Sequence, residues 1–276
     1  MTGHVQSLFR QEVPSAADVE SFHQDGYIYF PDVFLDEARE QLVEEIHQLV
    51  SVREYLEQPA AGENDPKTYF VRPWNDRGPC GDQLIDDPFV TALLQATIGD
   101  DYHFCHSALN LAPRGIAPIP YHQDHHHWKH DNPVNRAERD KYYIQILYYP
   151  NGFARGDRNL KVIPGSHLVA PTQEVTAERM LAGVYDGETG RKLEELRLDV
   201  PPGSMVYINA RIFHAVEAKP VDSPQAYRIF NIDIFKEAGP PHRFTQKISD
   251  EWMTQAGSSR RKLFARDAYE EGCWSI

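Results

Sequence analysis

The chain has 276 residues and a mass of 31.7 kDa, and its 41% hydrophobic content is enough to bury a substantial core. With 28 basic and 41 acidic residues the formal net charge is −13, so nucleic acid and anionic membrane surfaces would be repelled as partners. The sequence leaves the oligomeric state open. Seven of the 13 histidines fall between residues 103 and 130, which points to chemistry there.

The ends and cysteines of the chain predict a soluble, cytoplasmic protein. Three scattered cysteines, Cys80, Cys105 and Cys273, support neither a disulfide framework nor a paired-cysteine zinc site, so a reducing compartment fits. The first ten residues lack the apolar core of a signal peptide, and no later stretch reaches the roughly 20 apolar residues that cross a bilayer.

The first hundred residues are predicted to be mainly helical. A short helix over 15–23 has Ser15 as its N-cap and stops at Asp25-Gly26, and a strand follows over 27–30. Apolar residues at helical spacing predict a long helix over 35–55 and another over 87–98. The polar stretch 58–81, which contains proline and glycine, is predicted to be a loop.

After residue 100, short runs of aromatic and β-branched residues alternate with turn signals. They predict eight strands, over 102–111, 120–124, 142–148, 160–163, 196–200, 204–208, 213–217 and 227–235. Helices followed by strands predict a mainly β fold with flanking helices, whose core is a double-stranded β-helix of the jelly-roll, cupin-like kind. The charged insertion 172–195 is helical, mobile or a lid.

We expect one domain over residues 1–276. Its parts would be a helical N-terminal part of about 1–100, a jelly-roll core of about 101–240 and a C-terminal extension over 241–276. The chain shows no internal repeat and no linker that would argue for a second domain.

His122 and Asp124 are two residues apart, so on a strand both side chains would project from the same face. That arrangement suits two neighbouring ligands of one metal, and His214, from a distant strand, is the best candidate for a third. Two histidines and one carboxylate form a facial triad, which leaves positions on Fe(II) open for a co-substrate and O₂. The competing interpretation is a pair of hydrogen-bonding residues at a strand surface.

Arg228 lies among apolar neighbours in the strand 227–235. A buried guanidinium needs an anionic partner, and its planar fork suits a carboxylate. A metal triad together with an inward arginine is what binding of 2-oxoglutarate requires. Arg228 would then hold the distal carboxylate of that co-substrate.

Several motifs resemble the phytanoyl-CoA hydroxylase family of Fe(II)/2-oxoglutarate dioxygenases. Phe22-His23-Gln24-Asp25-Gly26-Tyr27 is similar to the family's opening F-x-x-D-G-Y, and Val162 to His167 is similar to its V-I-P-G-S-H segment. Pro202-Gly203-Ser204, His214 and Arg228 follow in the family's order. The resemblance implies an enzyme whose cofactors are Fe(II), 2-oxoglutarate and O₂, with metal ligands His122, Asp124 and His214.

The segment 106–113 resembles the Q-S-R-I-N-L-K-P of the ectoine hydroxylase branch. By that resemblance Asn110 would contact 2-oxoglutarate together with Arg228, and so would His106, which replaces the family's Gln. Trp128 matches an active-site Trp of the same branch. We add His125, His127, Tyr142 and Gln145 as candidate residues of the substrate pocket.

A second His-x-Asp at His23-Gln24-Asp25 precedes a turn and is predicted to be structural. For the histidines at 125–130 three roles stay open, namely substrate contact, alternative metal ligand or exposed polar run. The predicted reaction is oxidation, most simply hydroxylation, of a small organic molecule with release of succinate and CO₂. The same scaffold also hosts epoxidation, desaturation or cyclisation, and the rival from another class is a non-catalytic metal-binding jelly-roll protein.

Overall fold

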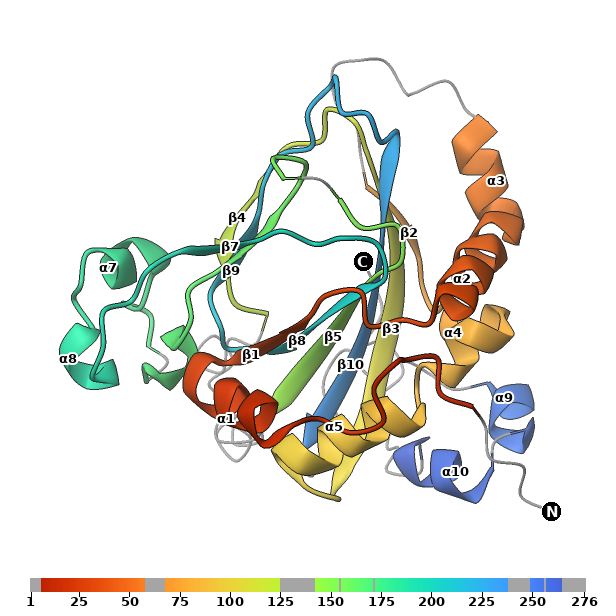
Figure 1. Cartoon of the computed structure of the whole chain (residues 1–276), viewed down its shortest axis with the longest axis horizontal. Helices are drawn as coiled ribbons and strands as arrows, with labels where there is room; N and C mark the ends of the chain where they lie inside the picture. Colours follow the sequence, from red (N-terminus) through yellow and green to blue (C-terminus); the bar gives the residue numbers. More distant parts are fainter. Residues whose placement is uncertain are drawn as a thin grey trace.

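The strands of the computed structural model form two antiparallel sheets (Figure 1). The model describes residues 6–57, 68–124, 142–153, 155–170, 172–237, 249–255 and 257–264. The larger sheet has the order β1 (Tyr27–Phe30), β8 (Ser204–Asn209), β5 (Tyr143–Tyr149), β10 (Tyr227–Glu237), β3 (Tyr102–Pro113), β2 (Tyr69–Val71). The smaller sheet has the order β4 (Ile119–His122), β9 (His214–Val216), β6 (Leu160–Val162), β7 (Leu196–Leu198).

The inner strands β5 and β8 of the larger sheet are buried on both faces, because their alternate side chains enter different cores. On β5, Ile146 and Tyr148 pack into a core shared with the helices, whereas Leu147 and Tyr149 pack into a second core. That second core also contains Leu160 of the smaller sheet. The space between the two sheets is therefore the interior of the β fold.

Helices surround the larger sheet, as Figure 1 shows for α1 and α5 below it and for α2 to α4 at its right. In α1, Ser15 and Asp18 form a capping box, and Gly26 ends the helix in the left-handed conformation. The helices are α1 (Ala16–Asp25), α2 (Asp36–Gln48), α3 (Val50–Glu57), α4 (Pro79–Gln83), α5 (Pro88–Ile98), α7 (Ala177–Leu181), α8 (Asp186–Thr189), α9 (Asp250–Gln255) and α10 (Ser258–Phe264). Among the described residues, no helix is both long and apolar enough to span a membrane.

The predicted fold class and all eight predicted strands are confirmed, with ends that shift by a few residues. The single helix predicted over 35–55 is wrong, because Leu49 is extended and separates α2 from α3. The loop predicted over 58–81 is also wrong in its described part. That part contains β2, a 3₁₀ turn (Asn75–Arg77) and α4, whose start is fixed by Pro79 at its first position.

The insertion 172–195 carries α7 and α8, at the far left of Figure 1. Met180 and Leu193 pack with Ile163 and Phe213 in a small core of their own. Phe213 of this core directly precedes β9 in the chain. The core therefore supports the strand that begins at His214.

Candidate metal centre and its cavity

Two strands of the smaller sheet bring His122 and His214 together. In the pairing of β4 with β9, His122 lies directly opposite His214. Asp124 lies just beyond β4, so the predicted strand over 120–124 is wrong at its end and the same-face argument does not place this carboxylate. Instead, the Asp124 backbone N–H donates to the carbonyl of Ala210, 3.1 Å away, which fixes the chain as it leaves the strand.

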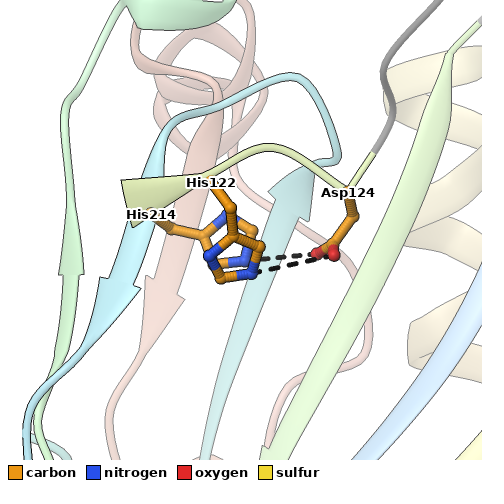
Figure 2. Close-up of side chains that lie close together, drawn as sticks. All are labelled: His122, Asp124 and His214. Carbon is orange, nitrogen blue, oxygen red and sulfur yellow. Dashed lines mark ion pairs between the residues drawn. The ribbon is translucent and has the colours of Figure 1, made fainter. Parts of the chain in front are cut away.

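The three predicted ligand side chains converge on one point (Figure 2). Their ligand atoms all lie within 4.8 Å of one another. His214 Nε2 is 3.2 Å from Asp124 Oδ2, and His122 Nε2 is 3.8 Å from Asp124 Oδ1. The imidazole centroids of His122 and His214 are 4.2 Å apart.

Backbone carbonyls orient both imidazole rings. His122 Nδ1 donates to the carbonyl of Pro120 at 2.8 Å, and His214 Nδ1 donates to that of Ile212 at 3.2 Å. Since each Nδ1 carries a proton, Nε2 is the nitrogen of each ring that would coordinate a metal, and both Nε2 atoms face Asp124. Two imidazole nitrogens and one carboxylate at one point fit Fe(II) with coordination positions left open.

The electrostatics of the three groups are coupled. Burial opposes ionisation of Asp124, but hydrogen bonding and charge from His214 hold the pKa of this carboxyl well below its usual range. Burial lowers the pKa of His122, and the neighbouring His214 lowers it further. Asp124 is therefore a carboxylate and His122 is neutral, the forms in which both groups bind metals.

Gln145 supports the carboxylate from β5. Its Nε2 donates to Asp124 Oδ2 at 2.6 Å. The sequence predicted Gln145 as a pocket residue, and the structure places it on the cavity wall as a direct partner of Asp124.

A cavity of about 370 Å³ extends from the three side chains into the space between the sheets. It lies within the size range of small-molecule sites. The predicted residues His106, Asn110 and Arg228 all line it. The other lining residues are Thr68, Phe70, Arg72, Ala108, Ile119, His122, Asp124, Tyr143, Gln145, Leu147, Tyr149, Arg158, Leu160, His214, Val216, Phe230, Ile232 and Ile234.

The predicted co-substrate residues come from β3 and β10, which are paired in the larger sheet. Asn110 lies opposite Phe230, and its Nδ2 donates to the Phe230 carbonyl at 3.3 Å. His106 lies 3.5 Å from the Tyr143 hydroxyl, and burial, with the nearby Arg72 charge, lowers the pKa of this histidine to about 3. His106 is thus a neutral polar group in the cavity wall.

The remaining predicted pocket residues are placed differently. Tyr142 packs against Phe22 in the core shared with the helices, with ring centroids 5.8 Å apart, and it does not line the cavity formed by the described residues. His125, His127 and Trp128 lie outside the described residues. Sequence reasoning missed Arg158, because this residue lies in a turn with no periodic pattern that could indicate the direction of its side chain.

Comparison with protein families gives one match over most of the chain. A family model described as phytanoyl-CoA dioxygenase matches residues 22–228. A search of curated protein sequences gave no match.

Solved structures share the fold at low sequence identity. The carbocyclase SnoK of nogalamycin biosynthesis, described as non-heme and alpha ketoglutarate dependent, is 17% identical with a TM-score of 0.63, covering 92% of this chain and 94% of its own. EctD from S. alaskensis with 2-oxoglutarate and 5-hydroxyectoine is 18% identical with a TM-score of 0.63, covering 84% and 81%. The epimerase SnoN with Fe³⁺, alpha ketoglutarate and nogalamycin RO is 13% identical with a TM-score of 0.60, covering 86% and 96%.

Proposed function

Because this chain belongs to the phytanoyl-CoA dioxygenase family, it is a 2-oxoglutarate-dependent dioxygenase, and we propose that it hydroxylates a small organic molecule at the centre formed by His122, Asp124 and His214. The observation that carries this proposal is the convergence of these three side chains at the wall of a cavity that Arg228 also lines. Bound Fe(II) would supply the activation of O₂ that couples substrate oxidation to conversion of 2-oxoglutarate into succinate and CO₂.

The side chains of the protein bind and orient the reactants. His122, Asp124 and His214 would hold Fe(II), and Arg228 would pair with the distal carboxylate of 2-oxoglutarate. Asn110 and His106 offer neutral polar groups along the wall between these two ends. Leu147 and Ile232 add apolar side chains to the same cavity wall.

Relatives in fold differ in the reaction named for them. One structure contains 5-hydroxyectoine, and two others are a carbocyclase and an epimerase. All three act on small molecules, which supports a small-molecule substrate here. Hydroxylation is our proposal. Cyclisation, desaturation or epoxidation would be recognised by a product without a new hydroxyl group.

Succinate production tests the enzyme class directly. Protein with Fe(II), ascorbate, 2-oxoglutarate and a panel of small molecules should form succinate, and a chelator should stop the reaction until Fe(II) is restored. His214→Ala should lower the rate to the protein-free background, because one ligand of the triad is lost. Succinate formation that persists in His214→Ala would refute the proposed triad, and iron-dependent turnover that is absent from the wild type would favour a non-catalytic metal-binding protein.

Three further expectations stay predictions. They are a cytoplasmic location, one domain over residues 1–276, and the absence of nucleic-acid and membrane partners.

A further inference from the structure

Arg158 occupies a backbone conformation that is uncommon for a large side chain. It lies in the turn that leads into β6, and its φ is +62°. This left-handed region favours glycine and is otherwise visited mainly by Asn and Asp. Two backbone contacts hold the turn: the Arg158 N–H donates to the carbonyl of Ala218 at 3.2 Å, and the Arg158 carbonyl accepts from Arg228 Nη1 at 3.0 Å.

The Arg158 side chain is buried at the cavity, with only 2% of the residue exposed. Its Nη1 donates to the carbonyls of Ala117 and Glu217, at 2.9 and 3.3 Å. Its Nε is buried without a hydrogen-bond partner among the described residues. Backbone carbonyls therefore fix the guanidinium without neutralising its charge.

Arg228 lies beside Arg158 and also has no described carboxylate in contact with its guanidinium. Its guanidinium carbon lies 5.2 to 5.6 Å from the ring centroids of Tyr149, Phe153 and Phe230, which orient the group by cation–π contact. Its Nε is also buried without a described partner. Neither arginine forms an ion pair with a described carboxylate.

The neighbouring carboxylate, Asp157, is already engaged. Lys219 Nζ lies 2.8 and 2.9 Å from its two oxygens, and the Ser223 hydroxyl donates to Asp157 Oδ2 at 2.6 Å. All three groups are buried. Because Lys219 and Ser223 occupy Asp157, this carboxylate acts on Arg228 only at longer range, and neither guanidinium has a described carboxylate in contact with it.

Two buried cations that share one cavity wall destabilise each other unless an anion lies between them. Burial and the adjacent Arg228 charge lower the pKa of Arg158 to about 10, so both groups stay protonated at neutral pH. A carboxylate has two oxygens and can accept from both guanidinium groups at once.

We propose that Arg158 is a second binding residue for the distal carboxylate of 2-oxoglutarate, which it holds jointly with Arg228. This assignment rests on the proposed function, since it concerns the same co-substrate. It gives the protein a two-arginine clamp at the end of the cavity away from the metal centre. The clamp would select co-substrates with a carboxylate at that position over 2-oxo acids that end in a methyl group.

Binding of two related acids to protein loaded with Mn(II) in place of Fe(II) tests the proposal without turnover. The acids are 2-oxoglutarate and 2-oxopentanoate, which has the same five-carbon chain and a methyl group in place of the distal carboxylate. Titration calorimetry would compare the wild type with Arg158→Gly and Arg158→Lys. Glycine suits the φ of +62° and keeps the carbonyl that binds Arg228, so this variant removes the side chain without straining the turn.

Arg158→Gly should weaken binding of 2-oxoglutarate by about ten- to hundredfold and change binding of 2-oxopentanoate less than about twofold. Arg158→Lys, which keeps the charge but not the fork, should lie between Arg158→Gly and the wild type. Arg114→Gln is the matched control, because Arg114 also donates to backbone carbonyls, of Ser223 and Pro224, but does not line the cavity. It should bind both acids as the wild type does.

Equal binding of 2-oxoglutarate by the wild type and by a folded Arg158→Gly variant would overturn the assignment. A similar loss for both acids would also overturn it, because that pattern indicates a general change in the cavity. Thermal melting of each variant shows that it is folded, and Arg158→Lys provides the same comparison if the glycine variant unfolds. A wild type that binds neither acid would refute the proposed function itself, and the role of Arg158 with it.

Discussion

The tripeptide His-Gln-Asp occurs twice in this chain, at residues 23–25 and at 122–124, and the two copies lie in different structural settings. The first copy ends helix α1. Its histidine is exposed, and Asp25 pairs with Arg191 at 2.6 Å. The following Gly26 turns the chain in the left-handed conformation, with no room for a side chain beside His167.

The second copy ends strand β4 and faces another strand. Pairing with β9 brings His214 opposite His122, and the carbonyl two residues earlier in the chain orients each ring. Asp124 accepts a hydrogen bond from the amide of Gln145, and its two oxygens face the imidazoles of His122 and His214. Asp25 is instead paired with the guanidinium of Arg191.

The comparison shows that three residue types in a row do not define a metal site. What differs is the partner strand, which brings His214 from 90 residues away, and the group that binds the carboxylate, an amide in one copy and an arginine in the other. Both differences can be tested by parallel substitutions in the two copies.

Removal of the histidine from each copy should have the largest and most unequal effect. His122→Ala should lower the apparent affinity for Fe(II) in the succinate assay by more than the roughly 100-fold that loss of an outer-shell partner causes at most. His23→Ala should leave it unchanged, because His23 is exposed at a helix end. Circular dichroism would show that both variants fold. Equal losses in the two variants would contradict the distinction between the copies.

Much of the fold was predictable, because period-two alternation and turn residues mark strands locally. The break of the helix at Leu49 could not be predicted, because the neighbouring residues carry no signal that separates α2 from α3. The short elements between 68 and 83 were missed for a related reason. Strand β2 is only three residues long and is defined by its pairing with β3.

The candidate site was predictable where a motif was available. His122, Asp124, His214 and Arg228 follow from motif order and residue chemistry, and the structure brings all four to one cavity. The register that sets His122 opposite His214 and the conformation of Arg158 depend on contacts far apart in the chain. Tyr142, which directly precedes β5, shows the same limit, since the sequence does not state which face of this segment meets the helices.

The turn at Gly26, which follows the first copy, packs against His167. This histidine should make the stability of the protein depend on pH in the acid range. Burial lowers the pKa of His167 to about 4, and the charges of Arg211 and Arg191 lower it further. The hydrogen bond to the His23 carbonyl and the charge of Asp25 act in the opposite direction and raise the pKa. Because the folded pKa lies below the unfolded value of 6.5, the unfolded chain binds more protons between these values. Stability should therefore be complete above pH 6.5 and should fall by at most about 3 kcal/mol toward pH 4.

Urea unfolding of the wild type and His167→Gln at pH 7 and pH 4.5 measures this contribution. Gln keeps a donor for the His23 carbonyl but does not titrate, so the variant should lose less stability at acid pH. The difference between the two proteins separates His167 from the buried His103, whose pKa burial also lowers to about 4. Identical pH dependence in the two proteins would exclude a contribution from His167.

The smallest expected effects come from the residues that hold the two carboxylates. Gln145→Leu should weaken apparent Fe(II) binding about tenfold, because Asp124 loses the 2.6 Å hydrogen bond that orients it. Arg191→Met should leave Fe(II) binding unchanged and lower the free energy of unfolding by about 1 kcal/mol or less, since its pair with Asp25 is partly exposed. Iron titration in the succinate assay and urea unfolding of both variants give the two readouts. The two variants should therefore differ in which property they change. If Arg191→Met altered iron binding, or Gln145→Leu altered only stability, the difference between the copies would not lie in the groups that hold their carboxylates.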